Sequence, residues 1–287
     1  MIYNILFSET VDQSRLRRAL SVVFGVAEEH VDVADEEEMD SRNWEAWITA
    51  EYAQRDGDVR WALSVYSNDD VEARPAEKDL SLEMARMLGV VVLFPSEEDI
   101  PSIWRLATPR GEIAYARVEE PEEEGQEFRV VGVEIAVPEL PRARVSRFPE
   151  VIKELQLPTL LVDSFISADV GGAMREVRGL AVNWERLSVR MSSGWPPLSW
   201  YPAGMYVEDL QYRDKADRIQ RELSGDEVKL AAELFGALDA RYRDNTVDDG
   251  GRALVEAGEV ASDFLLSCSW YWLRRPVDVP WVGGRVG

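Results

Sequence analysis

Apolar positions in the first hundred residues follow two spacings, one typical of strands and the other of helices. Residues 2–7 form a short apolar run of the kind that a buried strand presents. Between Leu16 and Phe24 an apolar residue recurs every three or four positions, which places these side chains on one face of a helix. Gly25 is the expected end of that helix, because glycine readily adopts the left-handed conformation found at helix C-termini.

The next seventy residues continue this pattern. Residues 44–52 and 61–65 alternate apolar and polar side chains, as half-buried strands do, and Asp56-Gly57 between them favours a tight hairpin turn. A second helix is predicted over residues 79–88, with Gly89 at its end. The uniformly apolar run 90–94 then predicts a strand that is buried on both faces.

The order of these elements indicates a fold class. Strand, helix, strand, strand, helix, strand is the split βαβ order of ferredoxin-like folds. Three further predicted strands, residues 103–107, 113–118 and 128–137, are joined by turn-forming segments and indicate an antiparallel β-meander. We therefore predict an α+β protein whose N-terminal part is ferredoxin-like and is extended by this meander.

The second half of the chain has a less regular pattern. An apolar run at residues 157–166 is followed by a predicted strand pair around residues 177–191, and the prolines of residues 195–202 indicate a loop or a sheet edge. Helices are predicted over residues 207–223, from the capping-box sequence at residues 224–227 to about residue 243, and over residues 254–272. This part is therefore predicted to be mixed and largely α-helical.

Two domains are predicted, residues 1–140 and residues 141–287. The length of 287 residues favours about two domains. Pro138, Pro141 and Pro149 surround a stretch without clear periodicity, which is typical of a boundary. Charge also changes here, because residues 1–150 hold 33 acidic and 16 basic side chains, whereas residues 151–287 hold 21 and 16.

The net charge of −22 changes the range of expected functions. A surface this acidic repels nucleic-acid phosphates and anionic lipid head groups. We therefore expect neither direct nucleic-acid binding nor membrane binding, and the expected partner is a basic protein.

Cysteine and histidine are almost absent. Cys268 is the single cysteine, which excludes an intrachain disulfide and a thiolate-rich metal site. His30 is the single histidine, which argues against triads and multi-histidine metal sites. The chain has no glycine-rich phosphate-binding motif, and no cofactor is expected. Its first residues lack the pattern of a secretion signal, so we expect a cytoplasmic protein.

Two weak candidate sites contain carboxylates. Asp163 lies inside the apolar run 157–166, where a buried carboxylate is a candidate for catalysis and an Asp bonded to backbone amides at a strand end is the alternative. Residues 245–256 look like a degenerate EF-hand loop, with Asn245, Asp249 and Glu256 at ligand positions. Val247 occupies another ligand position without a side-chain oxygen, so an ordinary turn between helices is the favoured interpretation.

Two acidic runs and an aromatic loop are the candidates for partner binding. Dense negative charge steers a basic partner, although solvated loops are the simpler explanation. Aromatic side chains in the proline-held loop would anchor an interface if they are exposed, and packing between domains is the alternative. The candidate residues are Asp35, Glu36, Glu37, Glu38, Glu119, Glu120, Glu122, Glu123, Glu124, Trp195, Trp200 and Tyr201.

Three functions agree with these patterns. The first is a non-catalytic acidic protein that neutralises a basic, nuclease-type protein, as immunity proteins and antitoxins do. The second is a carboxylate-dependent enzyme or small-molecule-binding protein with a site between the two domains. The third is a DNA-mimic regulator, which requires carboxylates spaced along one elongated face. Charge and the lack of catalytic motifs favour the first.

Overall fold

A computed structural model describes residues 1–38, 42–98, 100–121 and 127–281. The chain divides into two compact units, Met1–Phe148 and Pro149–Gly287. The predicted boundary after residue 140 falls inside the first unit, because residues 144–145 form a strand of that unit's sheet. The acidic candidates Glu122, Glu123 and Glu124 lie outside the described residues.

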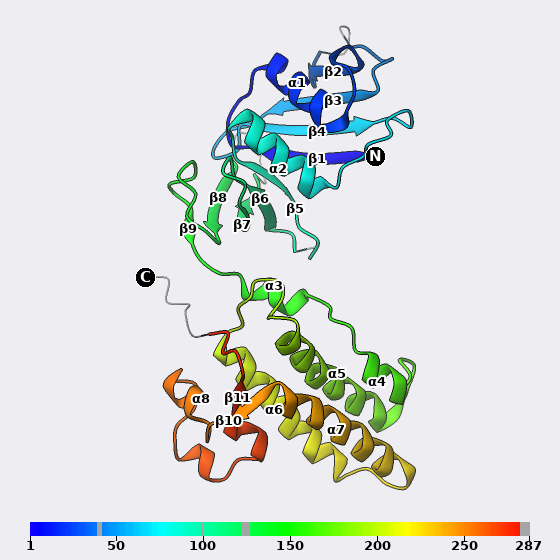
Figure 1. Ribbon diagram of the computed structural model, residues 1–287, viewed down its shortest axis with the longest axis vertical. Coiled ribbons are helices and arrows are strands. Elements are labelled where there is room, and N and C mark those ends of the chain that lie inside the picture. Colours follow the sequence, from blue (N-terminus) through cyan, green and yellow to red (C-terminus); the bar gives the residue numbers. More distant parts are fainter. Residues whose placement is uncertain (39–41, 99, 122–126, 282–287) are drawn as a thin grey trace. The chain divides into compact units, whose positions relative to one another are not determined.

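The first unit is built on a nine-stranded mixed sheet (Figure 1). Its strands are β1 (Ile2–Phe7), β2 (Val31–Asp35), β3 (Ile48–Gln54), β4 (Trp61–Ser67), β5 (Val92–Pro95), β6 (Ile103–Ala107), β7 (Ile113–Glu119), β8 (Arg129–Val133) and β9 (Arg144–Val145). Their order is β2-β3-β4-β1-β5-β6-β7-β8-β9. The β2–β3 and β8–β9 pairs are parallel, and the other neighbours are antiparallel.

Two helices follow the first and the fourth strand, α1 (Gln13–Phe24) and α2 (Glu77–Leu88). Asp12 caps α1 by accepting hydrogen bonds from the backbone N–H groups of Ser14 and Arg15, which satisfies donors that have no partner within the helix. Gly25 and Gly89 end the two helices in the left-handed conformation, with φ of 66° and 75°. Both predicted helix ends are confirmed.

The sheet has an apolar core on each of its two faces. α1 and α2 pack on one face, where Leu20 and Leu80 are buried with Val92. Leu93, the next residue of β5, belongs to a second core formed by β5 to β8 and the segment around Leu140. Successive residues of β5 therefore enter opposite cores, which confirms the prediction of a strand buried on both faces.

The hairpin and the meander of the first unit are confirmed, and two strand limits differ. β3 begins at Ile48 rather than at residue 44, because side-chain contacts keep the preceding loop out of the strand. Asp32 accepts hydrogen bonds from the Arg42 side chain and the Asn43 backbone, and Trp47 stacks on His30. β8 ends at residue 133, four residues earlier than predicted.

The second unit consists mainly of helices (Figure 1). They are α3 (Pro149–Glu154), α4 (Leu160–Phe165), α5 (Gly172–Ser192), α6 (Ala203–Gln220), α7 (Asp226–Asp244) and α8 (Arg252–Glu256), with a short strand pair, β10 (Thr246–Asp248) and β11 (Arg274–Pro276). α5 packs against both α6 and α7. The protein as a whole is thus mixed α+β.

Two expectations for the second unit are wrong. Residues 177–191 belong to one helix, α5, because buried Val177, Ala181 and Trp184 repeat at helical rather than strand spacing. The apolar run 157–166, to which no element was assigned from the sequence, contains α4. The predicted last helix stops at Glu256, since Gly258 has a φ of 78°, and the following residues form the 3₁₀ turns Phe264–Leu266 and Trp270–Leu273.

None of the helices in the described part of the chain is both long and apolar enough to cross a membrane.

Candidate functional site

The first acidic run forms an exposed turn at the end of β2. The backbone N–H groups of Glu37 and Glu38 donate to the side chain and the carbonyl of Asp35, at 3.1 and 3.0 Å. The Glu36 N–H donates to the Tyr52 carbonyl of the neighbouring strand at 3.0 Å. These backbone bonds fix the turn, and the side chains of the three glutamates are exposed to solvent.

The second acidic run begins where β7 ends. Glu119 is the last residue of β7 and lies opposite Arg129 of β8, with 3.5 Å between the carboxylate and the guanidinium. Glu120 and Glu127, on either side of the segment that is not described, are also exposed.

The turn between β3 and β4 connects the two acidic runs. Arg55 in this turn lies 3.6 Å from the Glu36 carboxylate. On its other side the turn is bonded to the residue before β8: Phe128 N–H donates to the Asp56 carbonyl and Asp58 N–H donates to the Phe128 carbonyl, both at 2.8 Å. Both runs, far apart in sequence, therefore lie beside the same hairpin turn: the first through Glu36, and the second through Phe128, next to the Arg129 that pairs with Glu119.

Gly57 makes this junction possible. Its φ is 103°, which L side chains rarely adopt, and a Cβ added there would lie 2.1 Å from the Phe128 carbonyl oxygen. The Asp-Gly sequence predicts the turn, whereas the contact of Gly57 with residue 128 is set by the sheet and has no local sequence signal.

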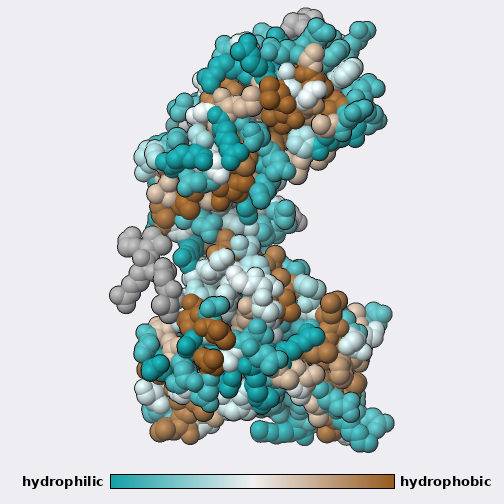
Figure 2. Space-filling view, in the orientation of Figure 1, coloured by the Kyte–Doolittle hydropathy of each residue, from teal (hydrophilic) through white to brown (hydrophobic). Residues whose placement is uncertain are grey.

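We define the acidic edge as the carboxylates of these three segments: Asp35, Glu36, Glu37, Glu38, Asp56, Asp58, Glu119, Glu120 and Glu127. Four arginines accompany them: Arg55, Arg60, Arg129 and Arg142. Arg142 pairs with Asp58 at 2.7 Å. Nine carboxylates against four guanidinium groups leave a local excess of negative charge. In Figure 2, hydrophilic residues cover most of the visible surface of the first unit, and hydrophobic residues form separate patches.

The aromatic candidates are not an exposed cluster. Trp195 and Tyr201 are each only 4% exposed, and their ring centroids are 5.2 Å apart. The Trp195 indole N–H donates to the Asp278 carbonyl at 3.2 Å, and Trp200 is partly buried. The proline-rich loop therefore turns its aromatic side chains into the second unit, and the expectation that they form an exposed anchor is wrong.

Asp163 is not a buried strand-end carboxylate. It lies in α4, its side chain is 50% exposed, and it forms an ion pair with Arg178 of α5. The environment that would favour a catalytic proton transfer, burial without a cation, is missing at this position.

The three candidate calcium ligands form hydrogen bonds or ion pairs with protein groups. Asn245 donates to the Arg241 carbonyl at 2.8 Å, and Glu256 lies 3.7 Å from Arg252. The Asp249 carboxylate accepts hydrogen bonds from the N–H groups of Gly251 and Ala253, at 2.9 and 2.8 Å, at the start of α8.

Asp249 and Glu256 do share a second feature, a pocket of about 460 Å³ that Trp200 and Trp281 also line. Among the residues that the structure describes, no group of three or more His, Cys, Asp or Glu side chains is arranged to hold a metal ion.

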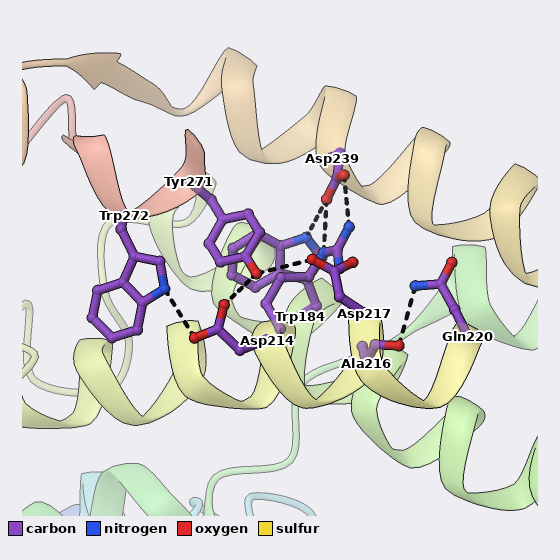
Figure 3. A network of polar contacts seen from close by, with 9 residues as sticks. Trp184, Asp214, Ala216, Asp217, Gln220, Asp239, Tyr271 and Trp272 are labelled. Atoms are coloured by element: carbon purple, nitrogen blue, oxygen red, sulfur yellow. Dashed lines mark hydrogen bonds and ion pairs between the residues drawn. The ribbon is translucent and has the colours of Figure 1, made fainter. Parts of the chain in front are cut away.

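A buried polar network in the second unit was not predicted (Figure 3). Asp239 of α7 accepts hydrogen bonds from Arg213 at 3.1 and 2.9 Å and from the Trp184 indole at 2.9 Å. Asp214 of α6 accepts from the Tyr271 hydroxyl at 2.5 Å and from the Trp272 indole at 3.1 Å. The partners come from α5, α6, α7 and a 3₁₀ turn, so no local sequence pattern marks them. These bonds hold the turn at residues 270–273 against α6.

A polar pocket of about 260 Å³ in the same unit was also missed. Lys153, Arg186 and Arg190 line it together with Glu208 and Asp209. Burial raises the pKa of Asp209 to about 7, even though its carboxyl accepts a hydrogen bond at 2.6 Å from the Tyr201 hydroxyl, which by itself lowers that pKa. Burial also lowers the pKa of Arg190.

Comparison of the chain with protein-family models, curated proteins and solved structures finds no match.

Proposed function

We propose that the protein is a non-catalytic, acidic protein-binding module that neutralises a basic protein partner, in the manner of an immunity protein or an antitoxin. The observation that carries this proposal is the meeting of two acidic runs at the β3–β4 turn. The acidic edge is the proposed docking surface. A nuclease fits the partner's chemistry, because proteins that act on nucleic acids carry basic surfaces.

Exposed carboxylates in fixed turns suit this task. They raise the rate of encounter with a basic surface by about 10 to 1,000-fold, and ions in solution screen this attraction over about 10 Å at 0.1 M salt. Because the turns are held by backbone hydrogen bonds, the carboxylates are positioned before a partner arrives.

We also propose a ferredoxin-like fold for the part of the first unit that precedes the meander. The neighbouring strands β3-β4-β1-β5 are all antiparallel, α1 follows β1, and α2 follows β4. Both helices pack in the core on one face of the sheet. β2, parallel to β3, is an addition at the edge of this arrangement.

The two other hypotheses have less support. A DNA mimic needs carboxylates in a long row, whereas the acidic edge gathers them from three segments around one turn. The enzyme with a site between the two domains had Asp163 as its candidate acid, and this side chain is half-exposed and paired with Arg178.

The experiment that tests the proposal is capture of the partner from the native host. The whole chain is immobilised, loaded with extract at about 0.05 M salt and eluted at about 0.5 M salt. We expect the eluted partner to be a basic protein, and if it is a nuclease, adding the chain should abolish its activity. Binding of the purified partner that is equal at both salt concentrations would contradict the proposal.

A further inference from the structure

We propose that the 260 Å³ pocket of the second unit binds a small anion through a phosphate or carboxylate group held between Lys153 and Arg186. This site is separate from the acidic edge, and its charge has the opposite sign.

Two helix faces form the walls of the pocket. α5 contributes Asn183, Arg186, Leu187 and Arg190, and α6 contributes Met205, Glu208, Asp209 and Tyr212. Each set has the spacing i, i+3, i+4, i+7, which places its members on one side of its helix. Lys153 from α3 and Tyr201 from the proline-rich loop complete the lining. The polar groups are therefore presented by regular elements.

Arg190 provides a fixed positive charge in the wall. Its guanidinium donates to the carbonyls of Ile152, Leu155 and Pro196 at 2.7, 3.3 and 3.2 Å. These partners are neutral, so they hold the side chain in place without cancelling its charge. An anion in the pocket is attracted by this charge across a short distance.

Arg186 and Lys153 are the groups that would contact the anion. One nitrogen of the Arg186 guanidinium donates to the Gln156 side chain, while its Nε is buried and has no hydrogen-bond partner among the described residues. A small rotation that turns this Nε–H toward an anion would satisfy it. Lys153 lies 3.9 Å from Glu208 with about half of its side chain exposed, so its ammonium can reorient toward a ligand.

Asp209 makes the site sensitive to pH. The charged groups around the pocket are Lys153 from α3, Arg186 and Arg190 from α5, and Glu208 and Asp209 from α6, with the Tyr201 hydroxyl bonded to Asp209. Burial raises the pKa of Asp209 to about 7, so below that pH three cations face one carboxylate, and above it they face two. Anion affinity therefore increases as the pH falls through 7.

The volume limits the size of the ligand. Sites for drug-sized molecules occupy about 300 to 1,000 Å³, and this pocket is smaller. It suits a single phosphate group or a short carboxylic acid.

The test is calorimetric titration of the whole chain with inorganic phosphate and, separately, with succinate, at pH 6 and pH 8. We expect saturable binding of at least one anion, and the anion that binds more tightly identifies the preferred group. Arg186→Gln should weaken binding by at least about tenfold, as expected from the loss of one charge-assisted hydrogen bond, and Arg186→Lys should weaken it less. The matched control is Arg175→Gln, an exposed arginine on the same helix, which should bind like the original protein.

Asp209→Asn separates the pocket's titration from that of phosphate, which itself changes charge near pH 7. With succinate, which is mostly the dianion at both pH values, this variant should bind as tightly at pH 8 as the original protein binds at pH 6. The proposal is overturned if neither anion binds saturably, or if Arg186→Gln and Arg175→Gln bind equally while both remain folded by circular dichroism.

Discussion

The acidic edge of the first unit and the buried carboxylates of the second unit have opposite roles. Most carboxylates of the acidic edge are exposed, and Asp58, whose side chain is 14% exposed and pairs with Arg142, is an exception. In the second unit, Asp239 and Glu185 point inward and bond to several partners each. Glu185 is 1% exposed, accepts hydrogen bonds from the N–H groups of Leu161 and Val162 at the start of α4, and pairs with Arg241 at 2.8 Å. Net charge alone therefore does not identify a docking surface.

The difference predicts which carboxylates the fold depends on. When a buried carboxylate is removed, the buried cation to which it was bonded is left without a counter-charge. When an exposed carboxylate is removed, water takes its place. The following variants test this contrast, and the expected change in stability decreases from one to the next.

Asp239→Ala should have the largest effect on stability. It leaves Arg213, whose side chain is 6% exposed, without its main partner and also removes the acceptor for the Trp184 indole. We expect the free energy of unfolding to fall by about 3 to 5 kcal/mol, measured by urea denaturation. Asp244→Ala, an exposed position on the same helix, is the control and should change it by less than about 0.5 kcal/mol. Equal losses of unfolding free energy in the two variants would refute the conclusion that the buried Asp239 carboxylate stabilises the fold.

Gly57→Ala should destabilise the first unit and separate its two acidic runs. The added Cβ would overlap the Phe128 carbonyl oxygen, and alanine disfavours a φ of 103°. A cost of about 2 to 3 kcal/mol is expected, together with weaker binding of the basic partner. Gly111→Ala is the comparison, because its φ of 87° imposes similar backbone strain away from the acidic edge. Partner binding lowered equally by both substitutions would argue against a special role for the junction.

Asp209→Asn should alter the dependence of stability on pH. In the folded protein the pKa of Asp209 is about 7, and in the unfolded chain it is about 3.9. Between these values the folded state binds more protons, so this group's contribution to stability is lost as the pH rises from about 4 to 7. The variant should remove that slope and be more stable than the original protein at pH 8 by at least about 1.4 kcal/mol, the equivalent of one pKa unit. Denaturation at pH 5 and pH 8, with the exposed Glu222→Gln as control, measures this, and an unchanged slope would contradict it.

Charge reversal of the acidic edge should have the smallest effect on stability. The edge variant carries Glu36→Lys, Glu37→Lys, Glu119→Lys and Glu120→Lys. Because these side chains are exposed, the four changes together should alter the free energy of unfolding by no more than about 1 kcal/mol, measured by thermal unfolding. A cooperative loss of several kcal/mol would mean that these carboxylates hold the fold instead.

The sequence pattern predicted most of the first unit. The spacing of apolar residues and the glycines at helix ends predicted six elements with limits close to those observed, because each has one buried face and a residue that clearly ends it. These elements are β1, α1, β4, α2, β6 and β7. The meander followed for the same reason. The parallel pairing of β2 with β3 was not predicted, since that contact depends on how the loop around Arg42 is held.

The second unit was predicted less well for physical reasons. Valines in α5 favour strands by intrinsic propensity, and the packing of Trp184 between helices outweighs that preference. The residues at 264–273 have helical spacing, yet the hydrogen bonds of Tyr271 and Trp272 to Asp214 hold them in short turns. Of the candidate sites, the acidic runs could be recognised from the amino-acid composition. Their proximity at Gly57, and the pocket between α5 and α6, depend on contacts between residues that are far apart in the sequence.

The most direct test compares two charge-reversed proteins of equal net charge. The edge variant has its four lysines in the first unit, and the control variant carries Glu154→Lys, Asp169→Lys, Glu222→Lys and Glu233→Lys at exposed positions of the second unit. Calorimetry measures the affinity of each for the purified basic partner. We predict that the edge variant loses at least about 100-fold in affinity and the control less than about threefold. Equal losses in both variants, or none in the edge variant, would contradict the assignment of the docking surface to the first unit.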